Sequence, residues 1–180
     1  GEAFTFDYDL PNETAYAETC AAIGLVFFAE RLLALRPQAQ FADVMELALY
    51  NAVLAGMSQD GRRFFYVNPL EVWPEASLRN PERKHVRPER QPWFGCACCP
   101  PNFARLILSL GRYVCDADGH TLFLHQYVSG TVPLPGGAEH SVLEVETNYP
   151  NDGRIRFVVR GDAPSDFCLS LRIPGWCRTF

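Results

Sequence analysis

The stretch Cys98-Cys99-Pro100-Pro101-Asn102 decides how the middle of this chain folds. Its two prolines are typical of the first turn of a helix, because the N–H groups of that turn have no helical partner to lose. The two thiols therefore lie where a helix begins, and a thiol at a helix N-terminus is shifted toward thiolate. Thiolate is the form of cysteine that binds metals and attacks carbon, so the sequence indicates an activated cysteine.

A second motif, Glu18-Thr19-Cys20, supplies further groups for a metal site. Three thiols and one carboxylate are enough to complete a tetrahedral zinc site. Residues two apart in a regular helix lie about 200° apart around its axis, so Glu18 and Cys20 can share an ion only if the helix begins there. Cys98 and Cys99 likewise need an irregular backbone. The spacing matches no standard zinc finger and predicts zinc or another thiophilic metal.

Composition limits the class of protein. The chain has 180 residues, of which 48% are hydrophobic, so it is globular and can hold one domain or parts of two. A net charge of −5 argues against a protein that binds nucleic acid. Seven cysteines are too few for a small secreted disulfide scaffold. We interpret Cys115, Cys168 and Cys177 as apolar filler, whereas packing alone does not explain three thiols at positions 96, 98 and 99.

The first two thirds of the chain is predicted to be mainly helical. Helices are expected over 19–35, about 41–57 and about 101–115. The run 20–29 is apolar on all sides, so the first helix should be buried, and it is too short to cross a bilayer. The second helix carries apolar or small residues at i, i+3, i+4 and i+7 spacing, which predicts a core-facing stripe of Val44, Leu47, Ala48, Asn51, Leu54 and Ala55.

A second pattern follows the helices. Residues 64–67 are predicted to form a short strand, and 79–91 a charged, proline-broken loop. After Asp118-Gly119 the hydrophobic period changes to two, which predicts half-buried antiparallel strands over 122–128, 154–160 and 167–173. Three helices cannot enclose much, and a few strands cannot complete a sandwich. We therefore expect a fragment of something larger, with apolar helix faces left exposed.

Several motifs together resemble the β-L-arabinofuranosidase family, glycoside hydrolase family 127. They are Gly1-Glu2-Ala3-Phe4, Leu10-Pro11-Asn12, Ala15-Tyr16-Ala17-Glu18-Thr19-Cys20-Ala21, Phe64-Phe65-Tyr66-Val67-Asn68-Pro69-Leu70-Glu71 and Cys98-Cys99-Pro100-Pro101-Asn102. The resemblance implies an (α/α)6 barrel followed by β-sandwich domains. The chain is then an α+β multidomain fragment: residues 1–117 hold the C-terminal part of the helical-barrel catalytic domain, and 118–180 the start of an antiparallel β-sandwich.

The resemblance also implies roles for single residues. It implies a retaining glycoside hydrolase that releases non-reducing-end β-L-arabinofuranose through a glycosyl–cysteine thioether, with Zn2+ as the cofactor. The matching positions give the zinc ligands Glu18, Cys20, Cys98 and Cys99, the nucleophile Cys98, the general acid/base Glu2, and Tyr66 as a substrate-binding residue. Without the resemblance, the residues alone do not favour Glu2 over the nearby acids Asp7, Asp9 and Glu13.

Two other functions stay open. One is a non-catalytic, zinc-stabilised carbohydrate-binding or scaffold module, in which Cys98 is only a ligand. The other is a redox protein or another metalloenzyme that uses the thiols. The expected partner is an arabinose-containing oligosaccharide or glycoconjugate, not a nucleic acid or a membrane; a homodimer of the full-length protein is left open. Because the chain begins with Gly1, we expect that the N-terminal part of the protein is missing and that the fragment alone is inactive. The cellular location stays undetermined, with the cytoplasm slightly favoured.

Overall fold

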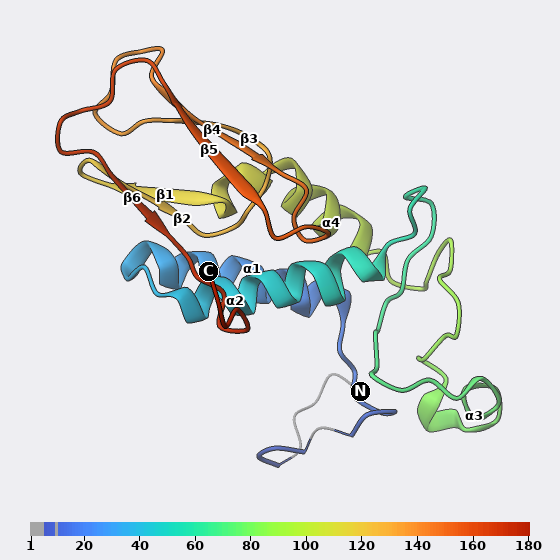
Figure 1. The fold of residues 1–180 in the computed structure, drawn as a ribbon. Coiled ribbons are helices and arrows are strands. Elements are labelled where there is room, and N and C mark those ends of the chain that lie inside the picture. The colour runs from blue at the N-terminus through green and yellow to red at the C-terminus, as the bar shows by residue number, and fades with distance from the viewer. Residues whose placement is uncertain (1–5, 10) are drawn as a thin grey trace. The chain divides into compact units, whose positions relative to one another are not determined.

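A computed structural model describes residues 6–9 and 11–180, and this part of the chain forms two compact units. The first unit contains the described residues of Gly1–Ala29 together with Val44–Leu108. The second unit contains Glu30–Asp43 and Ser109–Phe180. The helices α1, Thr19–Leu35, and α2, Ala39–Ala48, are labelled in Figure 1, and each begins in one unit and ends in the other.

The first predicted helix is confirmed as α1, with the bounds that the sequence predicted. Ile23, Val26 and Ala29 lie on its buried side. On its other side, Leu25 is exposed and Phe28 keeps 59% of its surface open. The prediction that this helix is buried on all sides is therefore wrong. The exposed apolar helix face that we expected of a fragment is present. None of the helices that the structure describes is both long enough and apolar enough to cross a membrane.

The second predicted helix differs from its expectation in two ways. It is divided into α2 and a π-helical segment, η1, Leu49–Leu54, in which the wider turn shifts the side chains around the axis. Its buried side is formed by Met45, Leu49 and Val53, whereas Leu47 of the predicted core stripe is 58% exposed. Of the predicted stripe only Ala48 is buried. The rest of the stripe is wrong because the helix is apolar on two faces, and periodicity alone does not say which face meets the rest of the chain.

The third helix is α4, Cys99–Leu108, which begins two residues before the predicted start and is followed by a 3₁₀ turn, η3, Leu110–Tyr113. Residues 64–67 do not form a strand, since Phe64 and Val67 make only isolated bridges. A short helix that the sequence did not predict, α3, Pro74–Arg79, leads into the charged loop. The loop itself contains a 3₁₀ turn, η2, Pro81–Arg83.

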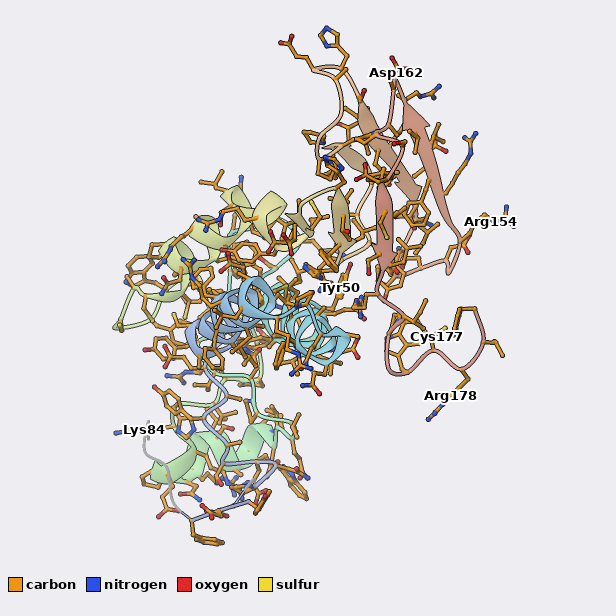
Figure 2. The ribbon with its side chains drawn as sticks, turned by 90° about the vertical axis from the view of Figure 1, so that its left-hand side faces the viewer. Tyr50, Lys84, Arg154, Asp162, Cys177 and Arg178 are labelled. Atoms are coloured by element: carbon orange, nitrogen blue, oxygen red, sulfur yellow. The ribbon has the colours of Figure 1, made fainter. Side chains whose placement is uncertain are left out.

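The second unit contains two three-stranded sheets. The first has the order β1-β2-β6 and the second the order β3-β4-β5 (Figure 1). Their bounds are β1, Cys115–Asp118; β2, Thr121–Leu124; β3, Gly130–Pro133; β4, Val142–Thr147; β5, Ile155–Arg160; β6, Cys168–Leu171. Arg154 and Asp162, labelled in Figure 2, lie just beyond the two ends of β5.

One strand pair contradicts the prediction that all strands are antiparallel. β6 pairs with β2 in parallel, with Leu122 opposite Leu169. Parallel neighbours need a crossover connection, and here the whole second sheet lies between β2 and β6 in the sequence. Alternation along a strand shows which face is buried but not the direction of its neighbour, so the sequence pattern could not show this.

Residues from both sheets form the core of the second unit. The buried cluster contains Leu122 of β2, Leu143 and Val145 of β4, and Leu134 after β3. Leu122 and Leu124 are buried while Thr121 and Phe123 are half-buried, which confirms the predicted period of two for this strand. The described chain is thus a mixed α/β arrangement with two small sheets.

Candidate metal and thiol site

Four predicted residues converge in the first unit. One ligand atom each from Glu18, Cys20, Cys98 and Cys99 lies within 4.8 Å of all the others. The Sγ atom of Cys99 lies 3.7 Å from that of Cys20 and 3.8 Å from that of Cys98. The Cys98 thiol donates to Glu18 Oε1 at 3.4 Å. Among the described residues, this is the one group of cysteines, histidines and acids with the spacing of a metal site.

Two helix entries bring these side chains together. Helix α1 begins at Thr19, so Glu18 precedes it and makes an isolated bridge to Val67. Helix α4 begins at Cys99, so Cys98 precedes it in the same way. Each pair of neighbouring ligands therefore includes one residue outside the helix. This is the irregular backbone that the spacing argument requires, because a regular helix would point the paired side chains apart.

Thr19 fixes the start of α1 against the segment that carries Tyr66. Its side chain is almost fully buried, and its Oγ1 donates to Phe65 O at 2.8 Å and accepts from Asn68 Nδ2 at 3.0 Å. Its backbone N–H donates to Tyr66 O at 3.0 Å. A Cβ at Gly56 would lie 3.1 Å from Thr19 Oγ1, so the glycine leaves room for this contact. Sequence reasoning missed Thr19, although it lies between two predicted ligands.

The four residues fit a zinc ion. Tetrahedral zinc with bonds of about 2.3 Å holds two sulfur ligands about 3.8 Å apart. The sulfur separations of 3.7 and 3.8 Å agree with that value. A disulfide would need about 2.05 Å, and all seven cysteines are free thiols. Three thiols with one carboxylate also form a donor set of the kind that zinc binds.

The surroundings of the thiols oppose their ionisation. Burial raises the pKa of Cys98 from 9.0 to about 11, although a hydrogen bond from Tyr66 acts in the opposite direction. Burial and the neighbouring thiol of Cys20 raise the pKa of Cys99 further. A cation between the sulfurs would reverse this effect, since positive charge favours the thiolate form. The cluster is therefore suited to an ion whose charge turns its thiols into thiolates.

Tyr66, which was predicted to bind substrate, lies beside the thiols. Its hydroxyl is hydrogen-bonded to Cys98, and this bond, with burial, raises the pKa of the phenol. Its ring contacts Tyr16 edge-on at 6.2 Å and Phe94 at 5.7 Å between centroids. Tyr16 in turn lies 5.5 Å from the ring of His85, whose pKa is lowered by burial. Aromatic rings thus hold the Tyr66 hydroxyl against the Cys98 sulfur.

Asn102 is a further polar residue at the site that the sequence analysis did not assign. Its Nδ2 donates to Cys20 Sγ at 3.4 Å. Asn102 belongs to the same motif as Cys99 and follows it by three residues in α4, which places both on one helix face. That spacing was the signal that could have identified it.

The structure does not place every predicted residue. Glu2 lies outside the described residues, so its role stays a prediction. Of the nearby acids, Glu13 pairs with Arg83 at 3.2 Å. None of the histidines of the β part belongs to the described metal cluster. His120 contacts Asp166 at 2.6 Å.

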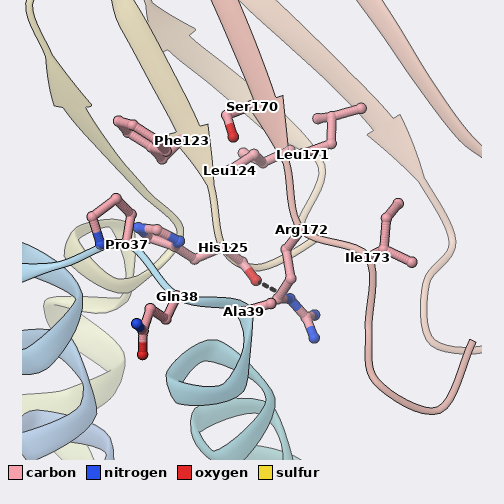
Figure 3. Close-up of a pocket in the computed structure, with 10 residues that line it drawn as sticks. All are labelled: Pro37, Gln38, Ala39, Phe123, Leu124, His125, Ser170, Leu171, Arg172 and Ile173. Carbon is pink, nitrogen blue, oxygen red and sulfur yellow. Dashed lines mark hydrogen bonds between the residues drawn. The ribbon is translucent and has the colours of Figure 1, made fainter.

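A pocket of about 150 Å³ lies within the second unit (Figure 3). It is lined by residues 37–39 and by the ends of β2 and β6, with His125 and Arg172 among them. Arg172 Nε donates to His125 O at 2.6 Å, and Arg172 Nη1 pairs with Asp43 at 2.6 Å. His125 Nε2 has no hydrogen-bond partner within the described part of the chain. None of the predicted site residues lines this pocket.

Comparison with protein families gives two matches. The model described as the catalytic domain of GH127 β-L-arabinofuranosidase matches residues 1–112. The model of the GH127 middle domain matches residues 121–180.

Individual relatives agree with these matches. A non-reducing end β-L-arabinofuranosidase from Bifidobacterium longum is 45% identical over 99% of this chain, which spans 27% of that relative's length. The crystal structure of a GH127 β-L-arabinofuranosidase from Geobacillus stearothermophilus T6 matches 98% of this chain with a TM-score of 0.89 and 53% identity, over 28% of its own chain. A second solved GH127 β-arabinofuranosidase matches 98% of this chain with a TM-score of 0.83 and 42% identity, over 26% of its own. The chain therefore spans about a quarter of the length of these relatives.

Proposed function

This chain belongs to the GH127 family of β-L-arabinofuranosidases, and from that premise we propose that it carries the nucleophile and the metal ligands of a retaining glycoside hydrolase. The observation that carries the proposal is the Cys98 thiol, which lies in one cluster with Glu18, Cys20 and Cys99. The likeness to relatives named β-L-arabinofuranosidases makes a non-reducing-end β-L-arabinofuranoside, within an oligosaccharide or glycoconjugate, the proposed substrate.

The proposed cofactor is Zn2+, held by Glu18, Cys20, Cys98 and Cys99. When bound, it supplies positive charge that lowers the pKa of the thiol ligands, so that a thiolate is available at neutral pH. Most retaining glycosidases use a carboxylate as the nucleophile. The raised pKa of about 11 for Cys98 in its buried surroundings explains why a thiol in this place needs such activation.

The residues then divide the reaction into two displacements. The Cys98 sulfur attacks the anomeric carbon and forms a C–S bond while the bond from that carbon to the leaving oxygen breaks. Glu2 gives its proton to the leaving oxygen. In the second step Glu2 takes a proton from water, the water oxygen attacks the same carbon, and the C–S bond breaks to restore Cys98. Two inversions retain the configuration. Tyr66, hydrogen-bonded to Cys98, orients the sulfur beside the sugar.

The same family membership supports the proposed architecture. We propose that residues 1–117 form the C-terminal part of an (α/α)6 barrel and that 118–180 begin an antiparallel β-sandwich. The exposed apolar faces of α1 and α2 support the first proposal, because barrel helices pack against neighbours on both sides. The two small sheets with a shared core support the second. A cytoplasmic location and a homodimer of the full-length protein remain proposals that rest on the sequence alone.

Trapping of the covalent intermediate tests the proposed function. The intact protein is mixed with an aryl β-L-arabinofuranoside that has a good leaving group, quenched in acid, and digested for mass spectrometry. We expect the peptide that contains Cys98 to gain one pentosyl group, and Cys98→Ser to lose both this label and turnover. Cys168→Ser, at an exposed cysteine of the second unit, is the matched control and should keep both. A pentosyl group on a carboxylate, or near-normal turnover by Cys98→Ser, would show that Cys98 is not the nucleophile.

The same experiment distinguishes the alternative of a non-catalytic module. A wild-type protein that binds zinc through these four residues, but neither hydrolyses the glycoside nor carries a label, would favour a scaffold in which Cys98 is a ligand only.

A further inference from the structure

We propose that Asn102 is a positioning residue that orients Cys20 in the metal site and strengthens metal binding through an N–H···S hydrogen bond. The inference rests on the proposed zinc site and adds to it a residue outside the ligand set. Its basis is the contact of 3.4 Å from Asn102 Nδ2 to Cys20 Sγ.

Asn102 connects the two halves of the site. Its backbone N–H donates to Cys98 O at 3.3 Å, so it lies one helical turn after Cys98, in the first part of α4. Its side chain reaches across to Cys20, in the first turn of α1. Within the described residues, the metal cluster takes Glu18 and Cys20 from one segment and Cys98 and Cys99 from the other. Asn102 therefore ties the entry of one helix to the entry of the other at the point where an ion would sit.

The chemistry of the donor set explains why such a bond matters. Three thiolates and one carboxylate outweigh the charge of a divalent cation, so negative charge accumulates on the sulfur atoms. An amide N–H aimed at a sulfur offsets part of that charge and fixes the direction of the side chain, as outer-shell partners of metal ligands do. Cys98 is hydrogen-bonded by Tyr66, whereas Cys20 accepts from Asn102. The two sulfurs thus have different donors: a phenol, which can ionise, for Cys98, and an amide, which cannot, for Cys20.

Two substitutions separate this role from a structural one. Asn102→Leu has a similar size and removes the donor without adding charge. Asn102→Asp has the same shape but presents only acceptors to the sulfur. A carboxylate in the first turn of a helix favours the helix, because it interacts with the positive helix end. If Asn102 only stabilised α4, Asn102→Asp would bind zinc as well as the wild type. If Asn102 positions Cys20, both variants bind zinc more weakly.

The measurement is the zinc dissociation constant of the intact protein, by competition with a chelator of known affinity. We expect both variants to bind zinc about 10- to 100-fold more weakly, the usual cost of losing an outer-shell partner. We also expect a shifted sulfur-to-metal absorption band after loading with Co2+, which reports directly on the ligating sulfurs. Asn151→Asp makes the same chemical change in an exposed turn and should leave both readouts unchanged. Asn102→Gln keeps an amide donor on a longer side chain and should bind zinc more tightly than Asn102→Leu, provided both show the melting transition of the wild type.

The outcomes are distinct. Wild-type zinc affinity and an unchanged Co2+ spectrum in Asn102→Leu would overturn the role of Asn102 while leaving the zinc site intact. Weaker binding in Asn102→Asp alone would also overturn it, because added charge rather than the lost donor would then be the cause. A wild-type protein that binds no zinc would overturn the zinc site itself, and this inference with it.

Discussion

The Sγ atoms of Cys20 and Cys99 lie 3.7 Å apart, although 79 residues separate them along the chain. Each belongs to the first turn of its helix. The separation is close to the distance of about 3.8 Å that tetrahedral zinc imposes on two thiolates. A metal bound here would join two distant segments of the first unit, so the residues that align the two helix entries should influence both folding and metal binding.

Thr19 is the residue whose substitution tests this alignment. In Thr19→Val the side chain keeps its shape but leaves Phe65 O and Asn68 Nδ2 without the bonds of 2.8 and 3.0 Å that they make now. Loss of a buried partner costs about 1–3 kcal/mol, so we expect the free energy of unfolding to fall by that amount. Zinc retention should fall too, because Glu18 and Cys20 flank the threonine. Denaturant unfolding and metal analysis of the intact protein measure the two effects.

An exposed threonine controls for the chemistry of this change. Thr131→Val, at an exposed position of β3, should leave stability and metal content close to those of the wild type. If Thr19→Val behaved like Thr131→Val, the hydrogen bonds of Thr19 would not hold the helix entry in place.

The reactivity of Cys98 should depend on metal and pH. Its pKa, raised by burial from 9.0 to about 11, means that the thiol stays protonated over a wider pH range than an ordinary cysteine. At pH 8, a rise of two units in the pKa lowers the fraction of Cys98 that is thiolate about 100-fold. In zinc-free intact protein at pH 8 we therefore expect alkylation of Cys98 by iodoacetamide to be about 10-fold slower than that of an unperturbed thiol, because the higher nucleophilicity of a thiolate with a raised pKa offsets part of the lower thiolate fraction, and to accelerate as the pH rises toward 11. Peptide mass spectrometry follows the rate at each pH. Fast alkylation at pH 8 without metal would show that Cys98 needs no cation for activation.

The sequence predicted the site better than it predicted the packing around it. The choice of four candidate ligands and their need for helix entries follow from residue chemistry and local geometry, and the structure brings these four side chains together at two helix entries, Glu18–Cys20 and Cys98–Cys99. The buried side of α2 does not follow from local pattern, since Leu47 and Leu49 are both apolar but only Leu49 is buried.

Other features depend on partners that are distant in the sequence. In the sequence Thr19 is an ordinary helix residue, and only the folded chain shows its hydrogen bonds with Phe65 and Asn68. The parallel pairing of β6 with β2 depends on the path of the chain between them, which alternation does not encode. The assignments of Glu2 and of the catalytic roles came from family resemblance, whereas the boundary near residue 118 came from the change of hydrophobic period there. All of them stay predictions.

His125 should make stability depend on pH. Burial lowers its pKa below 6.5, and the nearby charge of Arg172 lowers it further, while Asp116 acts in the opposite direction. The unfolded chain then takes up a proton near pH 6.5, but the folded chain resists it. The stability that comes from neutral His125 is therefore fully present above pH 6.5 and is lost as the pH falls below it. We expect the melting temperature of the intact protein to fall between about pH 7 and pH 5, and His125→Gln to reduce that fall.

The same substitution at His140, which is exposed, controls for the removal of a histidine. A pH dependence that is identical in the wild type and in His125→Gln would mean that another group causes it.

Glu2 is predicted to matter most for substrates with poor leaving groups. A general acid contributes by protonating the leaving oxygen, typically by about 10²- to 10⁴-fold, and a good leaving group needs little protonation. Glu2→Gln should therefore slow hydrolysis of a natural arabinofuranoside far more than that of an activated aryl glycoside. Steady-state rates of the intact protein on both substrates give the comparison, with Glu13→Gln as the matched control. Equal losses on both substrates, or a larger effect of Glu13→Gln, would assign the acid/base role elsewhere.

The last prediction concerns these 180 residues expressed alone. Large apolar side chains remain open to solvent, with Leu35 84% exposed and Leu108 88% exposed, and Phe28 and Leu47 more than half exposed. Burying one such side chain contributes about 1.5–3 kcal/mol, and several together rival the total stability of a domain, about 5–15 kcal/mol. We expect the isolated chain to be inactive and to aggregate or stay partly unfolded, which size-exclusion chromatography, thermal melting and an assay on an aryl β-L-arabinofuranoside would show. Because zinc binding alone could order the first unit, the measurement is made with and without the metal. A soluble monomer that melts cooperatively and cleaves the glycoside would show that the exposed helix faces need no further partner and that the fragment interpretation is wrong.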